Sequence, residues 1–146
     1  MSIRLSATPE DLRKGVLELK TRQDIASLLD VKYELLNYHL YISPADKRYT
    51  SFTLPKKSGG ERRISAPVTG LKIIQQKLNQ ALQAVYQPKP ATQGFSPERS
   101  IVTNAYPHTG KKYVLNIDLQ DFFPSINFGR VRGMFMATPY NLPEEV

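Results

Sequence analysis

The sequence predicts an α+β fold, in which N-terminal helices are followed by a β-hairpin, a long helix and a further strand. Three observations lead to this prediction. The first third of the chain combines helix-capping signals with apolar residues at helical spacing, residues 49–54 alternate and are rich in β-forming side chains, and residues 113–118 form an apolar run that ends on an acid. With 146 residues, the chain is long enough for one domain with its own core.

The first third contains three helix starts. Thr8 is a suitable N-cap, with Pro9 at the first helical position and acids in the first turn. Thr21 and Asp24 form a second signal of the capping-box type, and Asp30 is expected to cap a third helix. Helix-turn-helix DNA readers also contain short helices in series, but the second helix here lacks a basic face for reading bases. The apolar residues expected to line these helices are Leu12, Val16, Leu19, Ile25, Leu28, Leu29, Leu35, Leu36, Tyr38 and Leu40.

Residues 49–67 are expected to form a β-hairpin. Gly59 and Gly60 supply the positive φ angles of a tight turn, and Pro67 closes the hairpin. Such a hairpin can close over a triphosphate when it carries cations, with lysine as a point charge and arginine as a bidentate donor. A solvated edge hairpin protected by charge would have the same pattern, and the sequence leaves both interpretations open. The cations concerned are Lys56, Lys57, Arg62 and Arg63.

The rest of the chain is expected to contain one long helix and several shorter elements. Residues 69–85 predict an amphipathic helix. A proline-containing link follows, and then a short helix over residues 97–105. The buried strand at residues 113–118, a turn at residues 122–124 and a helix over residues 127–136 complete the chain. The apolar stripe of the long helix is expected to consist of Leu71, Ile74, Leu78 and Leu82.

Charge and composition narrow the class of protein. The chain carries 20 Lys and Arg against 13 Asp and Glu, a formal net charge of +7, which favours a polyanionic partner such as nucleic acid. A basic protein without such a partner, or one that binds anionic membranes, is the alternative. The absence of cysteine excludes a disulfide scaffold and a cysteine zinc site and fits a cytoplasmic location. The polar start is unlike a secretory signal peptide, and no apolar run is long enough for a membrane span.

Asp118 is the residue best placed for metal chemistry. A carboxylate at the end of a buried strand is well placed to hold a hard cation such as Mg²⁺ at the edge of a cleft. Phosphoryl-transfer sites need such a cation, because it neutralises the charge that develops on the phosphate. In an arbitrary sequence, the commoner explanation is that Asp118 or Asp121 caps the following turn. The two histidines, His39 and His108, are not at ligand spacing, so no histidine metal site is expected.

Four sequence blocks follow one another at residues 52–75, 93–101, 104–108 and 116–126. Together they resemble retron-type bacterial reverse transcriptases, which are related to the group II intron enzymes. Residues 52–67 with residues 71–75 resemble the first fingers block, and residues 93–101 resemble the next one. Residues 104–108, with the pattern Asn-Ala-x-x-His, match a signature of the retron branch. Residues 116–126 resemble the first palm motif. The resemblance covers about residues 50–135 and implies the fingers and partial palm of a right-hand polymerase.

The resemblance implies roles around the palm motif. Asp118 would be a ligand for two catalytic Mg²⁺ ions, and the backbone carbonyl of Leu119 would complete the metal shell. Phe123 would be the aromatic gate beneath the incoming sugar, where a bulky ring disfavours a 2′-hydroxyl and selects dNTP over rNTP.

The resemblance also implies roles for the fingers. Lys56 and Arg62 would hold the triphosphate, with Lys57 and Arg63 as substitutes because a one-residue ambiguity remains. Lys57 and Arg63 would also contact RNA, and four further residues have implied RNA roles. Gly94 and Phe95 would lie near the template, and Asn104 and His108 would recognise the cognate structured RNA or brace the fold.

The implied organisation is an N-terminal helical segment at residues 1–48, fingers at residues 49–110 and the start of the palm at residues 111–146. The parent enzyme would be an RNA-directed DNA polymerase that makes branched RNA–DNA from its own noncoding RNA. Its partners would be RNA template, cognate noncoding RNA, DNA product, dNTP and a retron effector protein, and its role would be antiviral defence. No membrane partner is expected.

The sequence departs from the family pattern after the first palm motif. The second acidic motif, Tyr-x-Asp-Asp, is absent, and Glu144 and Glu145 are poor substitutes for it. A Val-Thr-Gly run at residues 68–70 lies in the fingers, so it is not the later family motif of that sequence. This piece is therefore expected to be inactive alone. Its palm strand would lack neighbours, which predicts self-association through that edge or local disorder after about residue 110.

Three alternatives remain at this point. The chain could be a non-catalytic RNA-binding module that keeps the basic fingers. It could be similar to a group II intron maturase, against which Asn104 and His108 argue. A structural domain with a basic surface would not explain four blocks in order.

Overall fold

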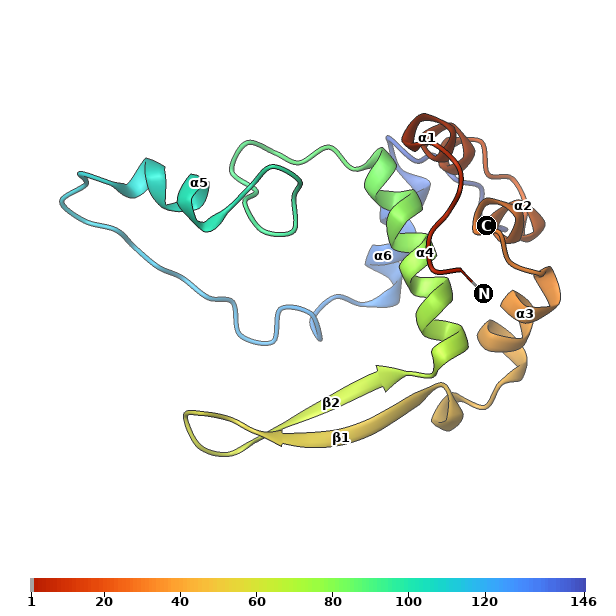
Figure 1. The fold of residues 1–146 in the computed structure, drawn as a ribbon, viewed down its shortest axis with the longest axis horizontal. Helices are drawn as coiled ribbons and strands as arrows, with labels where there is room; N and C mark the ends of the chain where they lie inside the picture. Colours follow the sequence, from red (N-terminus) through yellow and green to blue (C-terminus); the bar gives the residue numbers. More distant parts are fainter. Residues whose placement is uncertain (1) are drawn as a thin grey trace. The chain divides into compact units, whose positions relative to one another are not determined.

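The computed structural model describes residues 2–146 and divides them into two compact units. The first unit comprises residues 2–85 together with Gly133–Val146, and the second comprises Tyr86–Arg132 (Figure 1). Helices and one two-stranded sheet occur together, which agrees with the predicted α+β class. No helix in the described part of the chain is long and apolar enough to cross a bilayer.

The first two helices begin where their capping signals predict. Helix α1 spans Pro9–Leu17, and the Thr8 side chain accepts a hydrogen bond from the Asp11 amide at 3.2 Å. Helix α2 spans Arg22–Leu28 and has a complete capping box. In that box, Thr21 Oγ1 accepts from the Asp24 amide at 3.2 Å, while the Asp24 carboxylate accepts from the Thr21 amide at 2.8 Å. Both predicted caps are confirmed.

The third helix begins differently from the prediction. Helix α3 spans Tyr33–Asn37, and its N-cap is Lys32, which makes no side-chain capping bond. The expectation that Asp30 caps it is wrong. Asp30 has a φ of 47°, and its carbonyl oxygen accepts a hydrogen bond from Lys77 Nζ at 2.8 Å, so a long-range contact fixes it instead. A π-helical turn, η1 (Tyr38–Ile42), and a 3₁₀ turn, η2 (Ala45–Lys47), follow.

The predicted hairpin is confirmed. Strands β1 (Tyr49–Pro55) and β2 (Glu61–Pro67) pair in antiparallel register, with Phe52 opposite Ile64. The turn contains Gly59 and Gly60 at φ angles of 90° and 80°. These angles are strained for residues with a Cβ, which is why the turn needs glycine at both positions.

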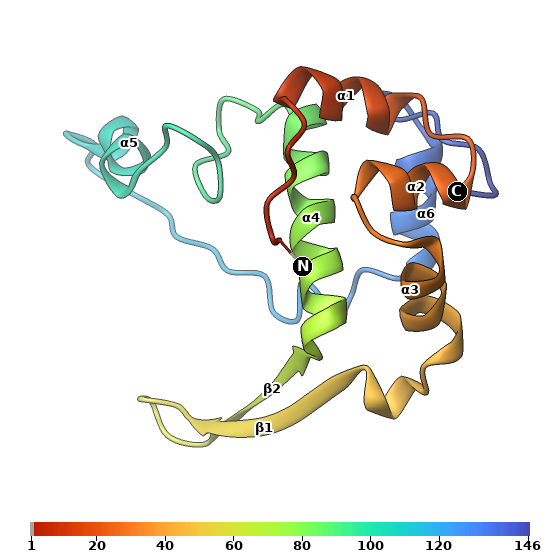
Figure 2. The same ribbon diagram turned by 45° about the vertical axis from the view of Figure 1, so that its right-hand side comes forward.

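Helix α4 (Thr69–Val85) has the predicted bounds but a different buried face. Leu78, expected in the apolar stripe, is 38% exposed, whereas its neighbour Lys77 is fully buried. The buried line therefore continues through Lys77, Ala81 and Val85, because α1 and the loop before α3 cover that side of the helix. Figure 2 shows α1 lying across one end of α4. The core cluster consists of Val16, Ala26, Leu29, Val31, Leu36, Ile74, Ala81 and Val85.

The second unit holds little regular structure. Helix α5 spans Ile101–Ala105, four residues later than predicted at its start, because Ser100 provides the capping box. The 3₁₀ turn η3 (Tyr106–His108) follows. Helix α6 (Phe128–Met136) confirms the last predicted helix and continues into the first unit.

Residues 113–118 do not form the predicted buried strand. They have no regular structure, and their side chains are exposed. The only sheet among residues 2–146 is the pair β1–β2, so the segment has no neighbouring strand to satisfy its backbone N–H and C=O groups. The prediction of a buried strand here is wrong, because an apolar pattern forms a strand only where a partner strand pairs with it.

Candidate functional site

The four hairpin cations lie at and beside the turn. Figures 1 and 2 show the hairpin extending away from α4, with its turn at the far end. Lys56 and Lys57 lie at the start of the turn, and Arg62 and Arg63 lie at the start of β2. All four side chains are exposed. The turn itself is closed by hydrogen bonds from the Lys56 amide to the Gly60 carbonyl at 3.0 Å and from the Gly59 amide to the Lys56 carbonyl at 3.1 Å.

The strand register places Arg62 and Arg63 on opposite faces of the hairpin. Arg62 is directly opposite Leu54, and Arg63 is opposite Thr53. Because opposite residues share a face and neighbours along a strand alternate, Arg62 shares its face with Phe52, Leu54 and Ile64. Arg63 shares the other face with Ser51 and Ser65.

Only one of the two arginines is held by a neighbour within the hairpin. Arg63 Nη2 donates to Ser51 Oγ at 3.5 Å, and Ser51 Oγ lies 3.2 Å from Ser65 Oγ across the strands. Among residues 2–146, no partner is found for the Arg62 guanidinium. Ser51 and Ser65 are not among the predicted site residues, although the alternation of the two strands around the glycine turn places them opposite each other.

The base of the hairpin is fixed to the helical part of the first unit. Gln75 Nε2 on α4 donates to the Tyr49 hydroxyl at 2.9 Å, and the Val68 amide donates to the Arg48 carbonyl at 3.0 Å. His39 packs directly against Gly70, and a Cβ at that glycine would overlap the imidazole. These contacts set the direction of the hairpin, so cations at its turn are positioned from a rigid base.

Asp118 presents an unpaired carboxylate in the second unit. Neither Asp118 nor Asp121 accepts a side-chain hydrogen bond within the described part of the chain. The turn that follows is closed instead by the Ser125 amide, which donates to the Asp121 carbonyl at 3.0 Å, and by Ser125 Oγ, which donates to the Phe122 carbonyl at 2.6 Å. The turn-cap alternative is therefore not what this structure shows. No group of three or more potential metal ligands occurs among the described residues.

Phe123 and Leu119 flank Asp118 in exposed positions. The Phe123 side chain is 81% exposed and makes an edge contact with Phe122, with ring centroids 5.3 Å apart. Leu119 is also exposed, and its carbonyl oxygen accepts no hydrogen bond from the described backbone. The aromatic ring and the carboxylate thus belong to one exposed loop of the second unit.

The other four residues expected to contact RNA, Gly94, Phe95, Asn104 and His108, lie in the same unit. Phe95 has a φ of 57° and a fully exposed ring, beside Gly94. The segment is tied to α5, because Thr103 Oγ1 donates to Gln93 Oε1 at 2.9 Å. Asn104 lies on α5 and His108 in η3, and both side chains are exposed.

A comparison with known protein families matches both the hairpin and the segment around Asp118. The family model described as reverse transcriptase (RNA-dependent DNA polymerase) matches residues 54–130, which run from the hairpin to α6. The chain belongs to the reverse transcriptase family. This match includes the hairpin cations, Asp118 and Phe123.

The curated relatives are retron enzymes. This chain is 39% identical over 133 residues to the retron Mx65 reverse transcriptase of Myxococcus xanthus, covering 90% of this chain and 31% of that protein. It is 35% identical to the retron Mx162 enzyme of the same organism, covering 82% of this chain and 25% of that protein. It is also 35% identical to the retron Ec86 reverse transcriptase of Escherichia coli, covering 87% of this chain and 40% of that protein.

These matches confirm the retron resemblance found in the sequence blocks. The chain spans about a third of the length of the Mx65 enzyme. No solved structure is significantly similar to it.

Proposed function

We propose that this chain supplies the fingers and the first palm carboxylate of an RNA-directed DNA polymerase of the retron type. The observation that carries the proposal is the continuous family match over residues 54–130, which includes both the basic hairpin and the segment around Asp118. A charged-edge hairpin alone would not be followed by this palm segment. The net charge of +7 agrees with a nucleic-acid substrate.

In this function, the hairpin binds the triphosphate of the incoming dNTP. Arg62 is the better candidate than Arg63, because Arg63 is bonded to Ser51, while Arg62 has an exposed guanidinium without a partner in the described chain. Of the two lysines, Lys56 is the better candidate than Lys57, because it precedes the turn residues as in the family pattern. A flexible lysine and a planar arginine then offer a point charge and a bidentate fork to the same phosphates.

The donor atoms around Asp118 are of the kind that binds Mg²⁺, but they are too few to complete a two-metal site. A carboxylate and a backbone carbonyl are oxygen donors of the kind that Mg²⁺ prefers. The described residues bring no third ligand to them, so further carboxylates must complete a two-metal site. Asp118 and Leu119 would hold the ions, which when bound stabilise the charge developing on the transferred phosphoryl group. Phe123 excludes a 2′-hydroxyl by its bulk.

The remaining parts of the proposal rest on similarity to retron enzymes. The template passes Gly94 and Phe95, and Asn104 and His108 recognise the cognate noncoding RNA. The parent enzyme synthesises branched RNA–DNA in the cytoplasm and acts with an effector protein in antiviral defence.

Primer extension tests the proposal directly. The 146-residue chain and the full-length gene product are each incubated with an RNA template, a DNA primer, Mg²⁺ and dNTPs. We expect extension by the full-length product alone and loss of extension by at least a hundredfold in its Asp118→Asn variant, a loss of roughly 3 kcal/mol of transition-state stabilisation. Asp121→Asn is the matched control, because it removes a nearby carboxylate of the same loop and should retain activity.

A second candidate function, a non-catalytic RNA-binding module, is favoured by one observation. The described residues combine a high positive charge with no group of three metal ligands. If the gene product ends at Val146, binds structured RNA and extends no primer, this function replaces the polymerase. Equal extension by the wild type and Asp118→Asn would contradict the assigned role of Asp118.

A further inference from the structure

A groove runs along the solvent-exposed side of α4, between this helix and the N-terminal segment. It has a volume of about 760 Å³ and lies entirely within the first unit. None of the residues assigned above to polymerisation lines it. The lining residues are Ile3, Arg4, Leu5, Pro67, Lys72, Gln75, Gln76, Asn79 and Gln80.

The groove combines positive charge with apolar walls. Arg4 and Lys72 are its charged residues, and none of the described residues that line it is acidic. Both side chains are exposed, and no partner is found for either in the described part of the chain. Ile3, Leu5 and Pro67 supply apolar surface, to which the aliphatic stem of Lys72 adds. A complementary ligand therefore carries negative charge and buries some apolar surface.

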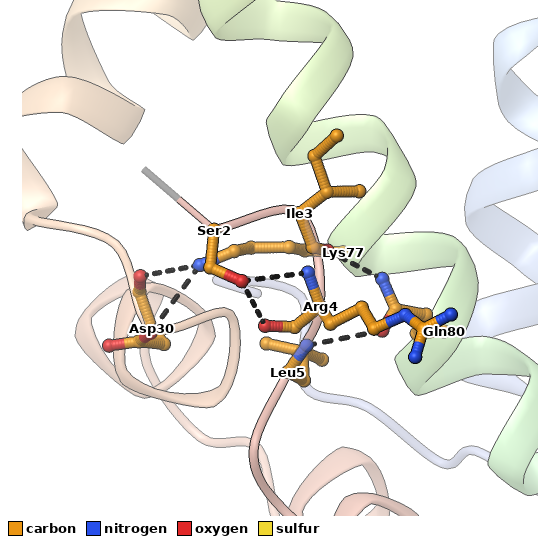
Figure 3. Close-up of polar contacts among 7 residues, drawn as sticks. All are labelled: Ser2, Ile3, Arg4, Leu5, Asp30, Lys77 and Gln80. Atoms are coloured by element: carbon orange, nitrogen blue, oxygen red, sulfur yellow. Dashed lines mark hydrogen bonds and ion pairs between the residues drawn. The ribbon is translucent and has the colours of Figure 1, made fainter.

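On this side, α4 already binds one stretch of peptide backbone. The Gln80 side chain accepts a hydrogen bond from the Leu5 amide at 3.1 Å and donates one to the Ile3 carbonyl at 2.8 Å (Figure 3). A glutamine side chain can do this because it carries a donor and an acceptor at one end, which match the N–H and C=O groups of a non-helical chain. The N-terminal segment thus shows how a peptide is held at this face of the helix.

Two further amides of α4 are available for a second stretch of backbone. Gln76 and Asn79 line the groove, and no hydrogen-bond partner is found for either side chain among the described residues. Their spacing of three residues places them side by side on the helix surface. Gln75, by contrast, donates to the Tyr49 hydroxyl at 2.9 Å. A second extended segment can therefore pair with Gln76 and Asn79 as the first one pairs with Gln80.

We infer that this groove binds an extended acidic segment of a partner protein. Gln76 and Asn79 pair with the backbone of that segment. Arg4 and Lys72 bind two of its carboxylates, and an apolar side chain between the two acids packs against Ile3. This protein-binding site is additional to the proposed polymerase function and shares no residue with it.

The positions of the two cations set the spacing of the acids. Figure 3 shows the Arg4 side chain extending towards α4 beside Gln80, and Lys72 is about 12 Å earlier along the helix axis. Extended backbone covers roughly 13 Å in four residues, so acids at positions i and i+4 reach both cations. Side chains two residues apart share a face of an extended chain, so the residue midway between the acids also faces the groove. The favoured pattern is an acid, an apolar residue and a second acid at alternate positions.

A polynucleotide is less suited to the groove. Proteins that bind single strands stack bases on aromatic side chains, and none of the described lining residues is aromatic. The cations at the hairpin turn do not line the groove either. An extended acidic peptide, in contrast, uses the amides, the cations and the apolar walls together.

The test uses a fluorescein-labelled peptide with the sequence Gly-Glu-Thr-Leu-Thr-Glu-Gly and a control peptide in which glutamine replaces both glutamates. Binding to the 146-residue chain is measured by fluorescence anisotropy at about 0.05 M salt, where exposed ion pairs are weakly screened. Mg²⁺, dNTPs and nucleic acid are absent, so the result is independent of polymerase activity. We expect a Kd on the order of 0.1 mM for the acidic peptide and roughly tenfold weaker binding of the control peptide.

The variant Arg4→Ala/Lys72→Ala should weaken binding of the acidic peptide roughly tenfold. The matched control is Arg13→Ala/Lys32→Ala, which removes one arginine and one lysine that are exposed in the same unit but do not line the groove. This control should bind the peptide as tightly as the wild type does. Thermal unfolding of each variant, followed by circular dichroism, checks that the fold is retained.

A charge exchange separates a specific site from general attraction to a basic protein. Arg4→Glu/Lys72→Glu should lose the acidic peptide and bind a peptide in which lysine replaces both glutamates. The wild type should not bind that lysine peptide. Gln76→Ala/Asn79→Ala should weaken binding of the acidic peptide several-fold, because it removes the hydrogen bonds to the peptide backbone.

Heteronuclear NMR spectra locate the bound peptide. The side-chain amides of Gln76 and Asn79 and the backbone amide of Arg4 should shift on titration with the acidic peptide. The proposal is overturned if the shifts fall outside the groove, or if the groove and control variants bind the peptide equally. It is also overturned if the groove variant loses affinity for an RNA oligonucleotide but not for the peptide, since the occupant would then be a polynucleotide.

Discussion

Lys77 shows how a single residue can change the buried face of a helix. Its side chain has a relative exposure of 0%, and its Nζ donates to the Asp30 carbonyl at 2.8 Å and lies 3.5 Å from the Asp30 carboxylate. Figure 3 shows this contact joining α4 to the loop before α3. A buried ammonium group is stable only when its donors are paired, and Asp30 supplies that pairing from its unusual backbone conformation.

Substitution of Lys77 should destabilise the first unit strongly. Lys77→Ala removes a buried aliphatic stem and a charged hydrogen bond, and we expect the free energy of unfolding to fall by about 3 kcal/mol. Lys77→Met keeps most of the packing volume and should cost only about 1 kcal/mol. Urea denaturation measures both values. An equal loss in the two variants would show that the charge, rather than the packing of the stem, determines the effect.

At the scale of elements, the capping box of α2 couples local sequence to stability. The backbone amides of Lys20 and Thr21 donate to the Asp24 carboxylate, which holds the pKa of that carboxyl below its usual value of 3.8. Because the folded-state pKa is lowered, the stabilisation is fully present above about pH 3.8 and is lost as pH falls through the lower folded value.

Asp24→Asn should therefore lower the thermal midpoint by a few degrees at pH 7. Below about pH 4, the midpoint of this variant should fall less with decreasing pH than that of the wild type. The measurement is thermal unfolding, followed by circular dichroism, from about pH 2 to about pH 7. Asp46→Asn, which removes an exposed carboxylate without a hydrogen bond in the described chain, is the control. The same acid dependence in Asp24→Asn and the wild type would show that the box does not contribute.

At the scale of the whole molecule, the buried core and the exposed apolar segment at residues 113–119 lie in different units. The core cluster belongs to the first unit. In the second unit, residues 113–119 expose a run of apolar side chains and unpaired backbone groups. Such a segment is a template for strand pairing, so the prediction of self-association or of local disorder after about residue 110 keeps its physical basis.

We expect the chain to associate as its concentration rises, and Ile117→Lys to reduce that association. Ile42→Lys is the matched control, because Ile42 is a similarly exposed isoleucine of the first unit, with 62% exposure against 73%. Light scattering after size-exclusion chromatography gives the mass, and hydrogen exchange gives the protection of residues 113–118. A monomer at all concentrations, with those amides protected, would contradict both parts of the prediction.

The local sequence determined the elements whose stability is local. Thr8, Thr21 and the glycine pair at the hairpin turn each fix a boundary through hydrogen bonds or backbone angles within a few residues, and these boundaries agree with the structure. The family resemblance was likewise a property of local blocks, and the family match over residues 54–130 confirms it.

Only the tertiary structure decided the features that depend on residues distant in the sequence. Asp30 was expected to cap a helix, but Lys77, 47 residues away in sequence, fixes it instead. The apolar segment at residues 113–118 was expected to be a strand, but pairing requires a neighbour that the described chain does not place beside it. The N-terminal segment is held to α4 by hydrogen bonds of Gln80 with Leu5 and Ile3, which are 75 and 77 positions away, and no local pattern encodes such contacts. Sequence periodicity specifies the preference of a segment, whereas the choice of partner is made by the whole fold.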